Sequence, residues 1–248
     1  MIIFQIGSKI RHVLTNGDMM KKRCSFFFYF LFLLIVLSAC TPAKSPPIST
    51  RNIYYAGGDN QVKDTLLKIG YGLVDDINDA DVFVLNDEIH SPYVIQSIMR
   101  NKGRGLILIP GEHIMYYGVE MDVQALIGQT VGDLIPSDNP VDLSVDDFFA
   151  RDDPLVTEID WTSAPQVLER AFLIGPGPGT PLIRREGYVE TVLYKLSNNE
   201  FYLSVYLDEQ HNLAFQEWEY FDYLMYHLVE RSAGAEPLSF TEFSAVFR

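Results

Sequence analysis

Two short apolar runs separated by a helical segment constrain the fold of this chain most strongly. Asp81–Leu85 (DVFVL) and Gly105–Ile109 (GLILI) are almost continuously apolar, as strands are when helices cover both faces of a parallel sheet. The neighbouring pattern adds a strand at Asn52–Ala56, a helical stripe at Val62, Leu66 and Ile69, and a second stripe at Val94, Ile95, Ile98 and Met99. Alternation of strand and helix predicts an α/β fold: an open, mostly parallel, flavodoxin-like sheet flanked by helices.

The second half of the chain predicts antiparallel strands and a closing helix. Val189–Leu196 and Phe201–Leu207 flank the turn-rich Ser197–Asn199, which favours a β-hairpin. We also expect a helix at Asp122–Ile127, a loop-rich stretch at Asp133–Asp153, a strand at Val167–Ile174 and a third strand at Leu213–Phe215. Apolar residues at helical spacing over Phe221–Val229, with Gly234 as a C-terminal cap, predict an amphipathic helix that packs on the sheet.

The N-terminal region is typical of an exported protein. The apolar segment Phe26–Leu37 follows three basic residues, Lys21, Lys22 and Arg23. Its 12 residues are too few to span a membrane, which takes about 20, but they suit a signal peptide. We therefore predict a signal peptide at 1–39, with 1–18 an over-long gene start, because Met19 and Met20 directly precede the basic residues.

The end of this segment, Leu37-Ser38-Ala39-Cys40, resembles the lipobox of bacterial lipoproteins at all four positions. The resemblance implies that Cys40 becomes the lipidated first residue and anchors the protein outside the cytoplasm. Position 41 is Thr rather than Asp, so the outer membrane is expected in a cell with two membranes. The alternatives are a plain signal peptide or an uncleaved anchor. The boundaries that follow are a lipidated tether at 40–51, a single α/β domain at 52–234, and a C-terminal extension leaving that domain at 235–248.

Composition narrows the class of partner. Removal of 1–39 takes away five of the 19 basic and one of the 33 acidic residues, which leaves a formal charge of −18. A surface this negative repels phosphate backbones and excludes nucleic acid as a partner. The two cysteines, Cys24 and Cys40, lie at or before the cleavage point. The exported domain thus has neither a disulfide nor a thiol nucleophile.

The strand pattern resembles the class I glutamine amidotransferase-like fold, especially its non-catalytic, trehalose-utilisation-like members. The resemblance rests on "DADVFVLND" and on "IMRNKGRGLILIPGE", within Asn52–Gly111. Catalytic members of that family carry a cysteine on a sharp turn after a central strand. This chain has no cysteine there. Amidotransferase activity is excluded because no thiolate is present to attack an amide.

Polar residues follow both apolar runs. Asn86, Asp87, Glu88 and His90 come after the first, and Glu112 and His113 after the second. Open parallel sheets bind ligands at the carboxyl ends of their strands, so Asp87, Glu88, His90, Glu112 and His113 form a candidate ligand-binding cluster. Polar residues also gather wherever loops begin, and no metal-binding spacing is present. We predict neither a metal nor another cofactor.

These observations favour a lipid-anchored domain without catalytic activity that binds a partner protein or a small ligand. It would be an accessory to a membrane transport or envelope system. One alternative is an extracytoplasmic hydrolase that uses Glu88, His90, Glu112 and His113, with or without a metal. The other is a carbohydrate-binding lipoprotein whose platform is formed by Trp218, Tyr220, Tyr223 and Tyr226. His211 and His227 have no evident partner in the sequence.

Overall fold

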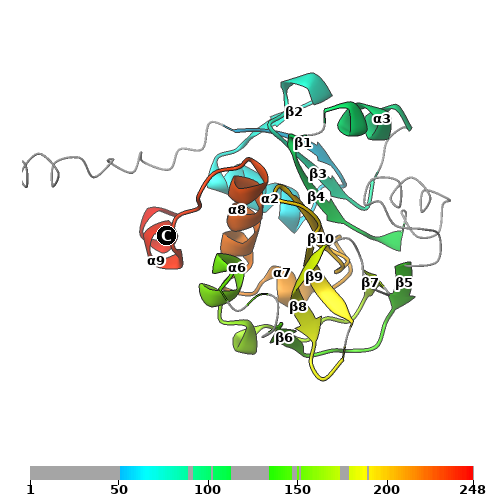
Figure 1. Cartoon of the computed structure of the whole chain (residues 1–248), viewed down its shortest axis with the longest axis vertical. Helices are drawn as coiled ribbons and strands as arrows, with labels where there is room; N and C mark the ends of the chain where they lie inside the picture. Colours follow the sequence, from blue (N-terminus) through cyan, green and yellow to red (C-terminus); the bar gives the residue numbers. More distant parts are fainter. Residues whose placement is uncertain are drawn as a thin grey trace, which may run out of the picture. The chain divides into compact units, whose positions relative to one another are not determined.

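The structure is a computed structural model, shown in Figure 1, which describes most of the chain after residue 50. The described residues are 51–88, 92–101, 103–112, 134–146, 150, 152–173, 179–188 and 190–247. Outside them lie the predicted signal peptide, Cys40, the predicted tether up to residue 50 and the helix expected at Asp122–Ile127. Within the described residues no helix is long and apolar enough to cross a membrane.

The four strands from the first half of the chain and β10 from the second half form the parallel part of a ten-stranded sheet, in the order β2-β1-β3-β4-β10. Its strands are β1 (Asn52–Ala56), β2 (Gly72–Val74), β3 (Val82–Asn86), β4 (Gly105–Ile109) and β10 (Glu200–Leu203), and its helices are α2 (Gln61–Ile69), α3 (Pro92–Arg100) and the 3-10 turn η1 (Ile77–Asp79). Each of these five strands runs parallel to its neighbour in this order. The prediction of a parallel α/β sheet is confirmed.

The two apolar runs become strands that are buried on both faces. Every residue of β3 and β4 is buried. Along β3, Val82 and Val84 pack into one core with residues of α2 and α8 (Phe221–Ser232), whereas Phe83 and Leu85 pack into a second core that includes Ile98 of α3. Helices therefore cover both faces of the parallel strands (Figure 1).

The antiparallel half is larger than the sequence predicted. Its strands are β5 (Leu134–Ser137), β6 (Leu143–Val145), β7 (Arg170–Leu173), β8 (Thr180–Arg185) and β9 (Thr191–Lys195). The β9–β10 hairpin, with Phe201 opposite Lys195, is confirmed. The stretch Asp133–Asp153, expected to be loop-rich, contains the short strands β5 and β6, and its other described residues belong to no helix or strand. Both strands are too short to produce a periodic signal.

The strand expected at Leu213–Phe215 is also wrong. These residues belong to a short helix, α7 (Leu213–Gln216), which follows α6 (Pro154–Thr157) and the 3-10 turn η2 (Trp161–Ser163) along the chain. Asn212 adopts a left-handed conformation, with φ of 50°, and turns the chain immediately before α7. Three residues are too few for apolar spacing to distinguish a strand from a helix.

The closing helix is confirmed as α8, and the chain beyond it returns to the domain. Gly234 has φ of 75° and donates its N–H to Arg231, as expected of a glycine that ends a helix. Residues 235–248, expected to leave the domain, include α9 (Phe240–Phe247), which packs along α8. The rings of Tyr226 and Phe243 lie 4.9 Å apart. Aromatic residues spaced along Phe240–Phe247 give α9 a face that is buried on α8.

Candidate functional site

The loops that follow the parallel strands enclose a hollow of about 470 Å³, which we call the carboxyl-edge hollow. It is lined by Gly58, Asn60, Asn86, Asp87, Glu88, Glu112, Asp208, Glu209, Gln210 and His211. The structure thus places three predicted site residues, Asp87, Glu88 and Glu112, around one hollow. The other two, His90 and His113, lie outside the described residues. This position, at the carboxyl ends of neighbouring parallel strands, is where open α/β sheets bind ligands.

Asp87 sits on a sharp turn directly after β3. Its φ is 61°, in the left-handed region that few residues other than glycine adopt. Its N–H donates to the carbonyl of Ile109, at the end of β4. A Cβ atom added to Gly111 would clash with Cβ and Cγ of Asp87, so glycine at 111 allows this close approach. Strained backbone of this kind often marks functional sites.

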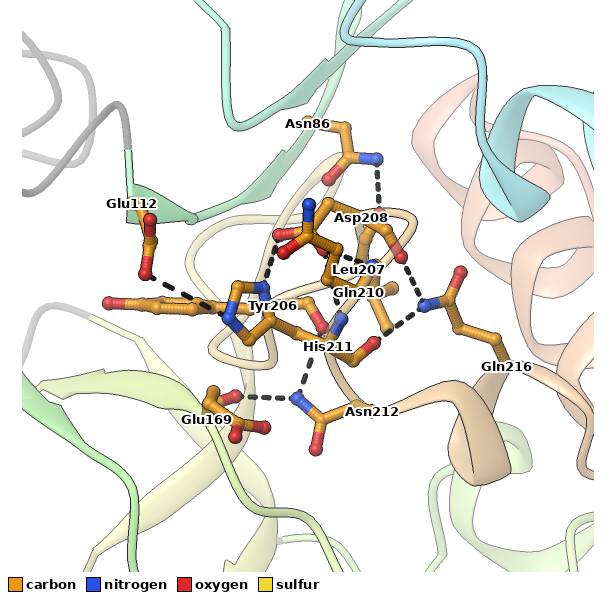
Figure 2. A network of polar contacts seen from close by, with 10 residues as sticks. All are labelled: Asn86, Glu112, Glu169, Tyr206, Leu207, Asp208, Gln210, His211, Asn212 and Gln216. Carbon is orange, nitrogen blue, oxygen red and sulfur yellow. Dashed lines mark hydrogen bonds and ion pairs between the residues drawn. The ribbon is translucent and has the colours of Figure 1, made fainter.

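The opposite wall is a loop that carries Asp208 and His211 (Figure 2). Asp208 accepts hydrogen bonds from the backbone N–H groups of Gln210 and His211, at 2.7 and 2.9 Å. Its second carboxylate oxygen lies 2.6 Å from Nδ1 of His211. The other ring nitrogen, Nε2, lies 3.8 Å from Oε1 of Glu112. The imidazole therefore stands between two carboxylates that come from different parts of the chain.

These carboxylates change the acidity of the imidazole. Burial by itself would lower the pKa of His211. The hydrogen bond and charge of Asp208, followed by the charges of Glu169 and Glu112, outweigh burial and raise this pKa. For Asp208, burial favours a higher pKa, but hydrogen bonds from Gln210 and His211 outweigh it and lower the pKa. The pair therefore favours an imidazolium beside a carboxylate.

Three buried amide side chains hold this loop in place. Nδ2 of Asn212 donates to the carbonyls of Glu169 and Tyr206, at 2.7 and 3.1 Å. Nε2 of Gln216 donates to the carbonyls of Asp208 and His211, each at 2.7 Å. The third amide is that of Asn86, which donates to the carbonyl of Leu207 at 2.9 Å. The loop is thus fixed from β3 on one side and from α7 on the other (Figure 2).

Asn86 also brings an unsatisfied acceptor to the hollow. Its side chain is 1% exposed, and Nδ2 donates both to Leu207 and to the hydroxyl of Tyr55, at 3.2 Å. These two bonds fix the orientation of the amide. Oδ1 is left without a hydrogen-bond partner among the described residues, and Figure 2 shows it turned toward the Asp208 loop. A buried polar atom of this kind normally has a partner.

The hollow is acidic. Five of its lining residues carry carboxylates and none is Lys or Arg. The described residues contain no group of three His, Cys, Asp or Glu side chains arranged to hold a metal ion. The arrangement is suited to bind a positively charged group, and its Asp–His pair is able to exchange a proton with a ligand.

The sequence reasoning missed the part of the site contributed by Asp208 and His211. His211 was expected to have no partner, and that expectation is wrong because Asp208 and Glu112 flank it. The sequence Asp208-Glu209-Gln210-His211-Asn212 did carry a signal. Asp and Asn are favoured in turns because their side chains bond to nearby backbone groups.

The C-terminal aromatics, considered as an alternative carbohydrate platform, are mostly buried. Tyr223 is 0% exposed, Tyr226 is 4% exposed and Trp218 is 7% exposed. Their rings pack against one another or against neighbouring aromatics, including Phe240 and Phe243 of α9. A sugar needs an exposed ring face to stack on, so these residues serve the core and the carbohydrate alternative is not supported.

Comparisons with known proteins found similarity among solved structures. No family model matches this chain, and neither does any curated protein. Among solved structures, a glutamine amidotransferase from Thermotoga maritima is similar, with 10% sequence identity and a TM-score of 0.44. The match covers 75% of this chain and 99% of the other. The assignment of the chain to the α/β class rests on its own strand order and register.

Proposed function

We propose that this protein is a lipid-anchored envelope protein whose α/β domain binds a small ligand in the carboxyl-edge hollow without transforming it. The observation that carries the binding role is the fixed loop of Asp208 and His211, held by buried amides of Asn86, Asn212 and Gln216. Because this loop is already fixed without a ligand, little conformational entropy is lost when a ligand binds. A site at the carboxyl edge of the sheet is consistent with this role.

The anchoring part of the proposal rests on the sequence. Leu37–Cys40 is similar to a lipobox, and a short polar tether separates Cys40 from β1. Two or three acyl chains on the first residue hold a protein firmly, because each buried methylene contributes about 0.8 kcal/mol. The location follows as the extracytoplasmic side of the cell envelope, and as the outer membrane in a cell with two membranes. Binding at that surface suits an accessory to a transport or envelope system.

A screen of small metabolites with the full lipidated chain in detergent tests the binding role. Cationic, neutral and anionic compounds are compared by their effect on the melting temperature. We expect compounds that stabilise the protein to lose their effect in Asp208→Asn, which removes the charge while keeping the shape. Glu186→Gln is the matched control, because Glu186 is exposed and outside the hollow. If no stabilising compound depends on Asp208, the binding role is contradicted.

Mass spectrometry of the N-terminal peptide tests the anchor separately. We expect residue 40 to be the first residue and to carry the mass of a diacylglyceryl group. A Cys40→Ser variant is expected to accumulate as an uncleaved precursor. A mature wild-type chain with an unmodified thiol would overturn this part alone.

Hydrolysis is a second candidate function, favoured by the 2.6 Å contact between Asp208 and Nδ1 of His211. A carboxylate that orients an imidazole is a common arrangement in general acid–base catalysis. His211, rather than His90 or His113, would then act with Glu112. The raised pKa of His211 favours the protonated imidazole, which would donate a proton as a general acid. Turnover of an ester or amide panel that disappears in His211→Gln would favour this candidate over simple binding.

A further inference from the structure

The geometry points to an organic cation with several N–H donors, an alkylammonium or guanidinium compound, as the ligand of the carboxyl-edge hollow. This inference rests on the binding role proposed above and names its chemical class. Two independent features carry it: the charge of the lining and the unsatisfied acceptor of Asn86.

The charge of the lining selects a cation. Asp87, Glu88, Glu112, Asp208 and Glu209 contribute five carboxylates, against one imidazole and no Lys or Arg. Even with His211 protonated, the described lining carries a net charge of −4. Such a wall repels anionic ligands and concentrates cations. Because the mature chain is acidic throughout, charge by itself would not distinguish this hollow from the rest of the surface.

The side-chain carbonyl oxygen of Asn86 distinguishes this hollow from the rest of the acidic surface. It is a buried acceptor whose orientation is fixed by the bonds of Nδ2 to Leu207 and Tyr55, and it has no partner among the described residues. A ligand with N–H groups can donate to it, whereas a quaternary ammonium cannot. Quaternary ammonium groups are usually bound by the rings of Trp, Tyr or Phe, and none of these is among the described lining residues.

The size of the hollow argues for a small molecule. Its volume of about 470 Å³ falls within the range typical of small-molecule sites, roughly 300–1,000 Å³. A bare metal ion would leave most of this space empty, and the described residues do not bring three suitable ligands together. A lysine of a partner protein would offer the same ammonium group, so the experiment has to separate the two sources.

Isothermal titration with the full lipidated chain in detergent, at physiological ionic strength, tests the inference. The probes are spermidine, agmatine, tetramethylammonium, calcium and pentalysine. We expect saturable binding of spermidine or agmatine, with tetramethylammonium and calcium at least tenfold weaker. Equal binding of all cations would show that binding depends on charge alone and not on N–H donors, and would overturn the inference. Pentalysine binding tighter than both amines would overturn the small-molecule assignment.

Matched variants locate the binding. Glu88→Gln and Glu112→Gln each remove one charge from the hollow, and Glu186→Gln removes one charge from an exposed position elsewhere. Loss of one charge-assisted hydrogen bond corresponds to about a tenfold weaker affinity. We expect that loss in at least one hollow variant and none in the control. Equal effects in all three variants would contradict a site at the hollow.

The outcomes separate this inference from the binding role on which it rests. Neutral or anionic compounds whose binding depends on Asp208 would overturn the cation assignment and leave the binding role intact. Absence of any compound whose binding depends on Asp208 would remove both.

Discussion

Gln216 is the residue that most directly supports the candidate site without lining it. Its amide nitrogen satisfies two backbone carbonyls, of Asp208 and His211, and the side chain is 3% exposed. We expect Gln216→Ala to lower the free energy of unfolding by about 1–3 kcal/mol, because buried carbonyls lose their donor. Urea denaturation measures this. Gln210→Ala, at an exposed position of the same loop, should change stability by less than about 0.5 kcal/mol; similar losses in both would argue against a supporting role.

The charge of Asp208 should be visible in the titration of His211. Because the folded-state pKa of His211 is raised, stabilisation by this pair is complete below the unfolded-state pKa. It is lost as the pH rises through the folded-state pKa. In Asp208→Asn we expect the pKa of His211 to fall, because its nearest negative charge is removed. NMR titration of the imidazole measures the change, with Glu209→Gln as the control. An unchanged pKa in Asp208→Asn would disprove the coupling.

The titration of His227 should lower stability as the pH falls, whereas that of His211 lowers stability as the pH rises. It is 1% exposed, and burial, followed by the charge of Arg231, lowers its pKa to about 3. As the pH falls below about 6.5, the unfolded chain binds a proton that the folded chain does not, so stability decreases down to about pH 3. Between about pH 7 and pH 4 the unfolding free energy of the wild type should therefore decrease. We expect His227→Phe to make this decrease about 2–3 kcal/mol smaller. Parallel pH profiles of unfolding free energy for variant and wild type would contradict this.

At the scale of the element, α9 makes a testable contribution. Phe243 is 6% exposed, and its ring lies 5.3 Å from that of Tyr223 and 4.9 Å from that of Tyr226. We expect Phe243→Ala to cost about 3 kcal/mol of unfolding free energy, as truncation of a buried aromatic does. Val246→Ala is the control on the same helix, because Val246 is 50% exposed. Equal and small losses would show that α9 does not stabilise the domain.

The length and burial of an element decide whether it could be predicted from the sequence. β3 and β4 are long enough and apolar enough to be predicted from the sequence, and α8 has a clear helical spacing that ends at a glycine. β5, β6 and α7 have three or four residues each, and their structure depends on partners distant in the chain. α9 was not predicted because the apolar pattern of residues 240–247 is compatible both with an extension that leaves the domain and with a helix packed on it.

The residues of the candidate site could likewise be predicted only where they follow elements that are recognisable in the sequence. Asp87, Glu88 and Glu112 could be predicted because they follow recognisable strands of one parallel sheet. His211 could not, because its place beside Glu112 depends on β10 lying next to β4, a pairing between residues about 90 positions apart. Asn86 and Gln216 look like ordinary polar residues in the sequence. Their role appears only when the carbonyls of the Asp208 loop come within reach of their amides.

At the scale of the whole molecule, the direction of the parallel strands separates the start of the domain, where the proposed anchor would be attached, from the candidate site. The described part of the domain begins at Arg51, next to the amino end of β1, where Arg51 binds Glu230 of α8. The carboxyl-edge hollow lies at the other end of the same strands. Eleven residues from Cys40 to Arg51 reach at most about 40 Å. With Cys40 lipidated, we predict that the amino edge of the sheet faces the membrane and the hollow faces away from it.

Single introduced cysteines test this orientation, because a chain processed at Cys40 as proposed would have no other thiol. Asp79→Cys places a probe at the amino edge and Asp59→Cys places one beside the hollow; both positions are exposed. On vesicles that contain headgroup-quencher lipids, we expect a fluorophore at 79 to be quenched more strongly than one at 59. Stronger quenching at 59 would reverse the orientation and direct the hollow toward ligands in the membrane. Equal quenching would mean that the tether lets the domain rotate freely, and the hollow would then be open to ligands from either side.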